Sequence, residues 1–169
     1  MVGKQSKQTE TMMQTALCEI ERKFLVRNGS FLSMASSVST ISQGYLSRDP
    51  ERTVRVRLRD EKGFLTVKGK NDSTGTSRFE WEKEIPAAEA RALLALCLPV
   101  VIEKQRYIVP YCGLTFEVDV FHGAHEGLVL AEVELSSPDQ PVSLPPFVGE
   151  EVTGNPLYYN ACLSQNIRK

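Results

Sequence analysis

Charged and apolar residues alternate along much of the chain. In LCEIERKFLV (17–26), Glu19, Glu21 and Lys23 stand at every second position. Successive side chains of a β-strand point to opposite sides, so these three residues would share one face of a strand. Strict alternation over short segments predicts strands, and seven further segments have it. These segments are 41–47, 52–60, 64–70, 78–85, 103–109, 114–121 and 128–136.

The segments between the predicted strands contain helix and turn signals. The clearest helix lies within IPAAEARALLALCLP (85–99), where apolar residues recur at helical spacing between two prolines. A weaker helical pattern covers residues 28–38, and Asn155 followed by Pro156 predicts the start of a short C-terminal helix. The predicted loops are a tight turn at 60–63, a hairpin loop at 71–77 and a proline-rich loop at 136–147.

The charges on the alternating faces are grouped by sign. Faces in contact with water usually mix both signs with Ser, Thr and Gln, whereas RTVRVRLRD (52–60) carries three arginines on one face. Like charges so close together repel unless opposite charges face them. About eight strands also suffice to close a sheet around a modest lumen. We therefore predict an α+β fold, an eight-stranded antiparallel closed β-barrel with a few flanking helices and inward charges. An open sheet with its charges in water is the alternative.

A closed barrel would bring acidic and basic strands together around one tunnel. Carboxylates are hard oxygen ligands suited to Mg²⁺ or Mn²⁺, and Lys and Arg bind phosphate oxygens. The predicted metal ligands are Glu19, Glu21, Glu117, Asp119, Glu132 and Glu134. The predicted phosphate-binding residues are Lys23, Arg55, Arg57, Lys68, Lys104 and Arg106. A small-molecule di- or triphosphate that arrives with a divalent cation would need both sets.

Several other polar residues are open to two interpretations. Arg59 stands at a strand end, and Glu80, Glu82 and Glu84 could face either the lumen or the solvent. His122 and His125 form H-x-x-H in a glycine-containing turn, where we expect no transition-metal site. Tyr158 and Tyr159 are predicted to pack within the C-terminal helix.

The composition and net charge bear on the partners, the domain organisation and the compartment that we expect for the protein. The net charge of -1 gives no reason to expect nucleic-acid binding, and no apolar run approaches the roughly 20 residues of a membrane helix. Residues 1–15 are polar and are expected to be a disordered leader or a cloning remnant, followed by a single domain over residues 16–169. Four widely spaced cysteines are expected to be buried thiols in the cytoplasm. The sequence leaves a monomer and a homodimer equally open.

Taken in order, these motifs resemble the CYTH superfamily, the triphosphate tunnel metalloenzymes. EIERKFLV is similar to the N-terminal E-x-E-x-K signature of the family, which alone often arises by chance. The segments VRVRL, TVKG, FEWEKEI, EKQRY, FEVDVF and AEVEL follow in the family order, and EVTGNPLYYN resembles the closing segment. The ordered set covers about residues 17–163 and is the specific signal.

The resemblance implies an eight-stranded tunnel that binds triphosphate with a divalent metal. QGYL (43–46) is most similar to the short bacterial members, which implies hydrolysis of inorganic tripolyphosphate to pyrophosphate and phosphate. It also implies that Tyr45 pairs with Lys23 in catalysis, beside Glu19 and Glu21. The alternatives are a class IV adenylate cyclase that converts ATP to cyclic AMP and pyrophosphate, a thiamine triphosphatase, and a non-catalytic polyphosphate-binding module.

Overall fold

The computed structural model describes residues 18–73 and 77–165. Within these residues the strands are β1 (Cys18–Val26), β2 (Ser37–Ser47), β3 (Arg52–Arg59), β4 (Lys62–Asn71), β5 (Ser77–Ile85), β6 (Leu98–Tyr111), β7 (Leu114–Phe121), β8 (Val129–Glu134) and β9 (Val148–Glu151). The helices are α2 (Phe31–Met34), α3 (Ala87–Leu94) and α4 (Asn160–Leu163), with 3₁₀ turns η1 (Gly123–His125) and η2 (Pro156–Tyr158). No helix of the described residues is long and apolar enough to cross a membrane.

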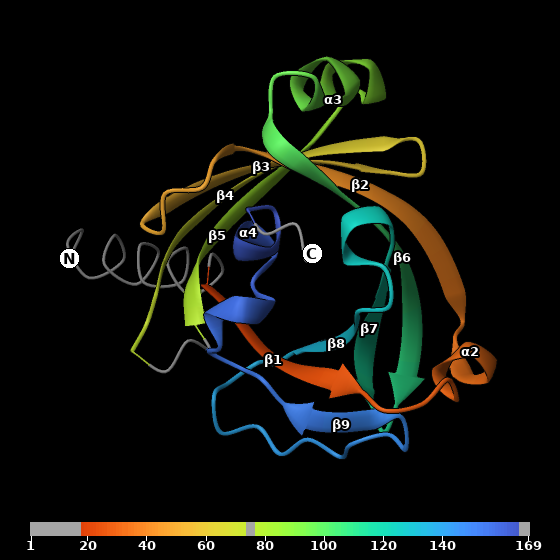
Figure 1. Ribbon diagram of the computed structural model, residues 1–169. Coiled ribbons are helices and arrows are strands. Elements are labelled where there is room, and N and C mark those ends of the chain that lie inside the picture. The colour runs from red at the N-terminus through yellow and green to blue at the C-terminus, as the bar shows by residue number, and fades with distance from the viewer. Residues whose placement is uncertain (1–17, 74–76, 166–169) are drawn as a thin grey trace, which may run out of the picture.

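Eight strands form a closed antiparallel barrel. They follow the order β5-β4-β3-β2-β6-β7-β8-β1, and β1 pairs back to β5 with Cys18 opposite Phe79. Figure 1 looks along the barrel, so the strands surround a central space. The predicted fold class is therefore confirmed. The ninth strand, β9, was not predicted. It pairs with the C-terminal end of β1, where Phe24 lies opposite Glu151 and Val26 lies opposite Val148.

The register between strands keeps the charged positions aligned inside the barrel. Arg55 of β3 lies opposite Thr66 of β4, and Thr66 lies opposite Glu82 of β5. Because side chains alternate across a strand, aligned partners point to the same side of the wall. Arg55, Thr66 and Glu82 therefore lie side by side on the face of the wall that lines the lumen, and every second residue along each of these strands shares that face.

The main hydrophobic core lies outside the barrel wall, over β1, β7 and β8. Phe24, Phe116 and Val133 point outward there and pack with Phe147, all essentially inaccessible to solvent. The segment that leads into β9 covers this face, and α2 adds Phe31 at its edge. Full burial of such a side chain stabilises the fold by about 1.5–3 kcal/mol. This outer core fixes the wall that carries the acidic strands.

A second apolar cluster closes one end of the lumen. Ile102 shares its strand face with Lys104, and Leu130 shares its face with Glu132, so these residues point inward. They pack with Leu163 of α4, which Figure 1 shows within the ring of strands. The remaining members are Tyr45, Phe121 and Leu128. The lumen is therefore apolar at one end and charged along the rest.

The structure corrects several local predictions. The predicted helix at 28–38 is only the four residues of α2, because from Ser37 onward the chain pairs with β6 as part of β2. β6 begins at Leu98, five residues before its predicted start at Glu103. The predicted leader and residues 74–76 of the predicted hairpin loop lie outside the described residues.

The prediction of buried thiols is also wrong for the cysteines whose side chains are described. Cys112 is exposed in the turn between β6 and β7, whereas Cys97 and Cys162 are half-buried. None of these three forms a disulfide.

Candidate active site

The charged part of the lumen is a cavity of about 1280 Å³. Nearly all predicted site residues line it, and they come from every barrel strand except β5. The predicted residues on its surface are Glu19, Glu21, Lys23, Tyr45, Arg55, Arg57, Lys68, Arg106, Glu117, Glu132 and Glu134. Lys104 and Asp119 are buried behind this surface.

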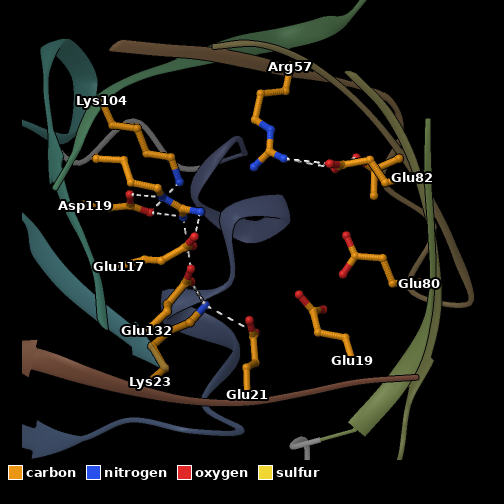
Figure 2. Close-up of polar contacts among 12 residues, drawn as sticks. Glu19, Glu21, Lys23, Arg57, Glu80, Glu82, Lys104, Glu117, Asp119 and Glu132 are labelled. Carbon is orange, nitrogen blue, oxygen red and sulfur yellow. Dashed lines mark hydrogen bonds and ion pairs between the residues drawn. The ribbon is translucent and has the colours of Figure 1, made fainter. Parts of the chain in front are cut away.

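Arg55 and Arg57 of β3 are held from the side by Glu82 of β5. Nη2 of Arg57 donates to both carboxylate oxygens of Glu82 at 3.0 Å, and Nη2 of Arg55 donates to one of them at 3.2 Å. The hydroxyl of Thr66 donates to the same oxygen at 2.7 Å. Figure 2 shows the Arg57 guanidinium reaching into the lumen with Glu82 at the wall beside it.

Asp119 binds the two cations of β6. Its oxygens accept from Nζ of Lys104 at 2.5 Å and from Nε and Nη2 of Arg106 at 2.6 Å each. Burial would raise the pKa of Asp119, but the charges of Arg106 and Lys104 outweigh it and lower that pKa. Burial, followed by the charge of Arg106, lowers the pKa of Lys104 to about 8. Arg106 also contacts Glu117 and Glu132, so Asp119 and Arg106 form the centre of one ion-pair network.

Lys23 lies where β1 meets the C-terminal segment. Its ammonium group is 2.8 Å from Glu132 and 3.9 Å from Glu21, and it donates to the backbone carbonyl of Tyr158 at 3.4 Å. Burial opposes the charged form, but Glu132 and Glu21 raise the pKa of Lys23 well above its usual value. Among the described residues, no hydrogen bond joins Lys23 to Tyr45. Burial raises the pKa of Tyr45 to about 12, so its hydroxyl stays protonated.

Glu19 and Glu80 form a carboxyl pair at the seam between β1 and β5. Lys68 lies 2.8 Å from Glu19 and 2.9 Å from Glu80. Burial alone would raise the pKa of Glu19, but the charges of Lys68 and Arg78 hold it well below its usual range. Burial, followed by a hydrogen bond to Glu19, raises the pKa of Glu80 to about 7.

Arg78 is a tunnel residue that the sequence analysis missed. Its guanidinium group lies 3.0 Å from Glu19 and 3.4 Å from Glu21, and it lines the cavity. The signal was available, because Arg78 has the same parity as Glu80 and Glu82 on β5. Of the residues left open, Arg59, Glu80 and Glu82 line the cavity, whereas the exposed Glu84 lies 3.7 Å from Lys62.

The histidines and the C-terminal tyrosines have different surroundings. His125 is buried, the two ring nitrogens have no hydrogen-bond partner among the described residues, and the ring packs against Phe121. His122 is partly exposed, 3.5 Å from Glu126. Tyr158 packs against the apolar cluster at the closed end, whereas Tyr159 lines the cavity and its hydroxyl accepts from Asn71.

The acidic end of the cavity has an excess of negative charge. Burial, and then repulsion by Glu19, Glu117 and Glu21, raises the pKa of Glu134. Glu134 has no ion pair with any described residue that would offset this repulsion. No three acidic, His or Cys side chains of the described residues lie close enough together to enclose an ion. The donor set nevertheless fits a divalent cation, because hard carboxylate ligands gather where an unbalanced negative charge would be neutralised.

The closed antiparallel sheet, with paired cations and carboxylates directed into its lumen, places this protein among the tunnel-shaped β-barrels. The CYTH domain matches residues 17–159, and the chain belongs to the CYTH domain family.

Two relatives carry the same descriptive name. The chain is 48% identical over 149 residues to a protein of Acetivibrio thermocellus named inorganic triphosphatase, covering 88% of this chain and 94% of that protein. It is 37% identical over 157 residues to a protein of Nitrosomonas europaea with the same name, covering 89% and 99%.

Solved structures share the fold. A crystal structure of an inorganic triphosphatase aligns with a TM-score of 0.61 and 33% identity, covering 88% of this chain and 95% of that one. A Hippeastrum protein described as having a dominant triphosphatase activity aligns with a TM-score of 0.58 over 71% of this chain and 80% of that one. Its identity of 16% shows a common fold alone.

Proposed function

We propose that this protein hydrolyses inorganic triphosphate to pyrophosphate and phosphate inside the tunnel. Water adds to a terminal phosphorus, one bridging P–O bond breaks, and the proton of the water is released. The observation that carries the proposal is the lining of a single cavity by cations of β1, β3, β4 and β6 and by carboxylates of β1, β7 and β8. The names of the two relatives support the choice of substrate.

The cations would hold the phosphate chain. Phosphoryl transfer depends mainly on positioning the phosphates and neutralising their charge. Arg55 and Arg57 extend into the cavity from β3, Lys68 from β4 and Arg106 from β6, so a phosphate chain in the cavity would meet cations of three strands. Lys104 lies behind Arg106 and would act through the shared Asp119.

The carboxylates at the acidic end would hold Mg²⁺ or Mn²⁺. We assign Glu19, Glu21, Glu132 and Glu134 to this role, with Glu117 beside them. Asp119 suits it less, since both of its oxygens already bind Lys104 and Arg106. A divalent cation held there would neutralise phosphate oxygens and lower the pKa of a bound water.

The remaining polar groups suit the proton movements of hydrolysis. Tyr45 keeps its proton at neutral pH and would donate a hydrogen bond, whereas Lys23 would contribute a positive charge. Glu80 has a pKa of about 7, which suits a group that accepts the proton of an attacking water. The free thiols Cys97, Cys112 and Cys162 are consistent with a reducing compartment, and we propose the cytoplasm.

A substrate panel tests the proposal. Tripolyphosphate, ATP, thiamine triphosphate and pyrophosphate would each be incubated with Mg²⁺ and with Mn²⁺, and the products identified by ³¹P NMR and chromatography. We expect tripolyphosphate to give the highest kcat/KM, with equal amounts of pyrophosphate and phosphate. Cyclic AMP from ATP would instead identify a cyclase, faster hydrolysis of thiamine triphosphate would change the substrate, and no turnover would indicate a binding module.

A further inference from the structure

Glu82 of β5 joins side chains of the two neighbouring strands β3 and β4. Its two oxygens accept hydrogen bonds from Arg55, Arg57 and Thr66 at 2.7–3.2 Å. The hydroxyl of Thr66 is fully buried and also accepts from Nη2 of Arg55 at 3.1 Å. Four groups from three neighbouring strands therefore form one closed network on the basic wall of the cavity.

The bonds to Glu82 use one nitrogen of each arginine. All of them run through Nη2, and no described residue bonds Nη1 of either arginine. Figure 2 shows the second terminal nitrogen of Arg57 directed toward the middle of the lumen. The network thus holds each guanidinium group by its Nη2 atom. The Nη1 atoms have no hydrogen bond to a described residue and could donate to an anion in the cavity.

Without a counter-charge the two guanidinium groups would repel each other. Their side chains come from the same strand two residues apart, and both are largely buried. Burial, followed by the positive charge of Arg55, lowers the pKa of Arg57 to about 10. The lowered pKa shows that the two buried positive charges repel each other. A bridging carboxylate reduces the repulsion, and immobilising long side chains before binding lowers the entropy that binding must overcome.

We propose that Glu82, supported by Thr66, is a positioning residue that holds Arg55 and Arg57 side by side to receive the phosphate chain. This inference rests on the proposed function, because it takes the two arginines as substrate ligands. It assigns Glu82 to neither metal binding nor proton transfer, since three donors already occupy its oxygens. Glu80, two residues earlier on β5, has a different environment beside Glu19 and Lys68.

Steady-state kinetics of substitutions on β5 and β4 test this role. Glu82→Ala is expected to raise the KM for tripolyphosphate at least about tenfold, with kcat within about threefold of the wild type. Glu82→Gln keeps the shape and one acceptor oxygen, and should raise KM less. Thr66→Val, which removes only the hydroxyl, should raise KM about threefold. Glu84→Gln is the matched control, because Glu84 is on the same strand but does not line the cavity, and it should leave both constants unchanged.

A double-mutant cycle checks that Glu82 acts through an arginine. In an Arg57→Ala background, Glu82→Ala should raise KM clearly less than it does alone, because one of its partners is gone. Melting temperatures of all variants would accompany the kinetics. Calorimetric titration with tripolyphosphate in the presence of a chelator should give the same order of affinities without turnover.

Three results would overturn the inference. An unchanged or lower KM in Glu82→Ala would mean that the carboxylate only competes with the phosphate. A fall in kcat of about a hundredfold at unchanged KM would place Glu82 in the chemistry, and additive effects with Arg57→Ala would remove the link to that arginine. If the wild type hydrolyses tripolyphosphate in these cases, the proposed function stands. A wild type that neither hydrolyses nor binds tripolyphosphate overturns both proposals.

Discussion

At the scale of single residues, the charge of each lumenal side chain depends on its neighbours. Glu19 and Glu80 are identical in chemistry and lie side by side, yet their pKa values move in opposite directions. Lys68 and Arg78 stabilise the anion of Glu19, and the anion of Glu19 in turn favours a proton on Glu80. The pair therefore carries one negative charge in mildly acidic solution and gains the second as the pH rises through about 7.

The raised pKa of Glu80 predicts a pH-dependent stability. Its value of about 7 in the folded protein exceeds the ordinary 4.5, so the stabilisation from its proton is complete below about pH 4.5 and is lost as the pH rises through 7. Glu80→Gln mimics the protonated form. We expect the variant to match the wild type at pH 5 and to exceed it by about 1–2 kcal/mol at pH 8, a figure reduced for solvent screening. Urea unfolding at both pH values measures this difference, and an equal gap at both would refute it.

Asp119 provides the opposite case, a buried anion with full partners. Asp119→Asn would leave Lys104 without an ion pair among the described residues and Arg106 with only Glu117 and Glu132, in an inaccessible site. We expect the free energy of unfolding to fall by about 3–5 kcal/mol, measured from urea midpoints at constant m. Asp139→Asn, at an exposed loop position, is the control and should change it by less than about 0.5 kcal/mol. A small effect at Asp119 would mean that the network contributes little to folding.

At the scale of elements, close packing fixes α3 against the barrel. A Cβ atom on Gly63 of β4 would lie 2.6 Å from Cβ of Ala90 and 2.8 Å from the carbonyl oxygen of Ile85. Backbone cannot move aside cheaply, so Gly63→Ala should destabilise the protein by about 1–3 kcal/mol. Gly29→Ala is the control, since its nearest atom would be 3.8 Å away. Thermal unfolding of both variants measures the effect, and equal melting temperatures would show that α3 can shift.

The elements differ in how well the sequence could predict them. Strands with charges at every second residue were predictable, because alternation reports the two faces of a strand directly. β9 was not, because VGEE is too short to show a period and its pairing with β1 depends on tertiary contacts. Ser37 and Val38, the first two residues of β2, fall at the end of the weak helical pattern over 28–38, and they are a strand because they pair with Ile108 and Tyr107 of β6.

The same limit applies to the site. Parity and closure of the barrel were enough to bring the predicted residues into one lumen. The partners of Asp119 and Glu82 depend on register between strands, which a single sequence does not specify. Arg78 was missed although its parity was visible, because its role depends on the β1–β5 seam that closes the barrel.

At the scale of the whole molecule, we expect the barrel to keep its fold without a bound metal. Continuous antiparallel pairing, an outer hydrophobic core and an apolar closed end hold it together. We therefore expect a chelator to abolish turnover of tripolyphosphate while the far-ultraviolet circular dichroism stays unchanged, and Mg²⁺ or Mn²⁺ to restore turnover. Full activity after exhaustive chelation would refute the metal role, and unfolding on chelation would make the metal structural.

The acidic end of the tunnel allows function and stability to be separated in one residue. Glu134 lines the cavity, is repelled by Glu19, Glu21 and Glu117, and forms no ion pair with the described residues. If its carboxylate serves only to hold metal for hydrolysis, replacing it should harm turnover and relieve the repulsion. Glu132 is less suitable for this purpose, because its charge also holds Lys23 and Arg106.

The most direct measurement is therefore the turnover of tripolyphosphate with Mg²⁺ by Glu134→Gln and by the wild type, with the unfolding free energy taken on the same preparations. We predict a loss of turnover of at least about a hundredfold, or ~2.7 kcal/mol in the barrier, together with a stability equal to or above that of the wild type. Near-normal turnover in a folded Glu134→Gln protein would contradict a role in triphosphate hydrolysis for Glu134 and the carboxylates around it, Glu19, Glu21 and Glu117.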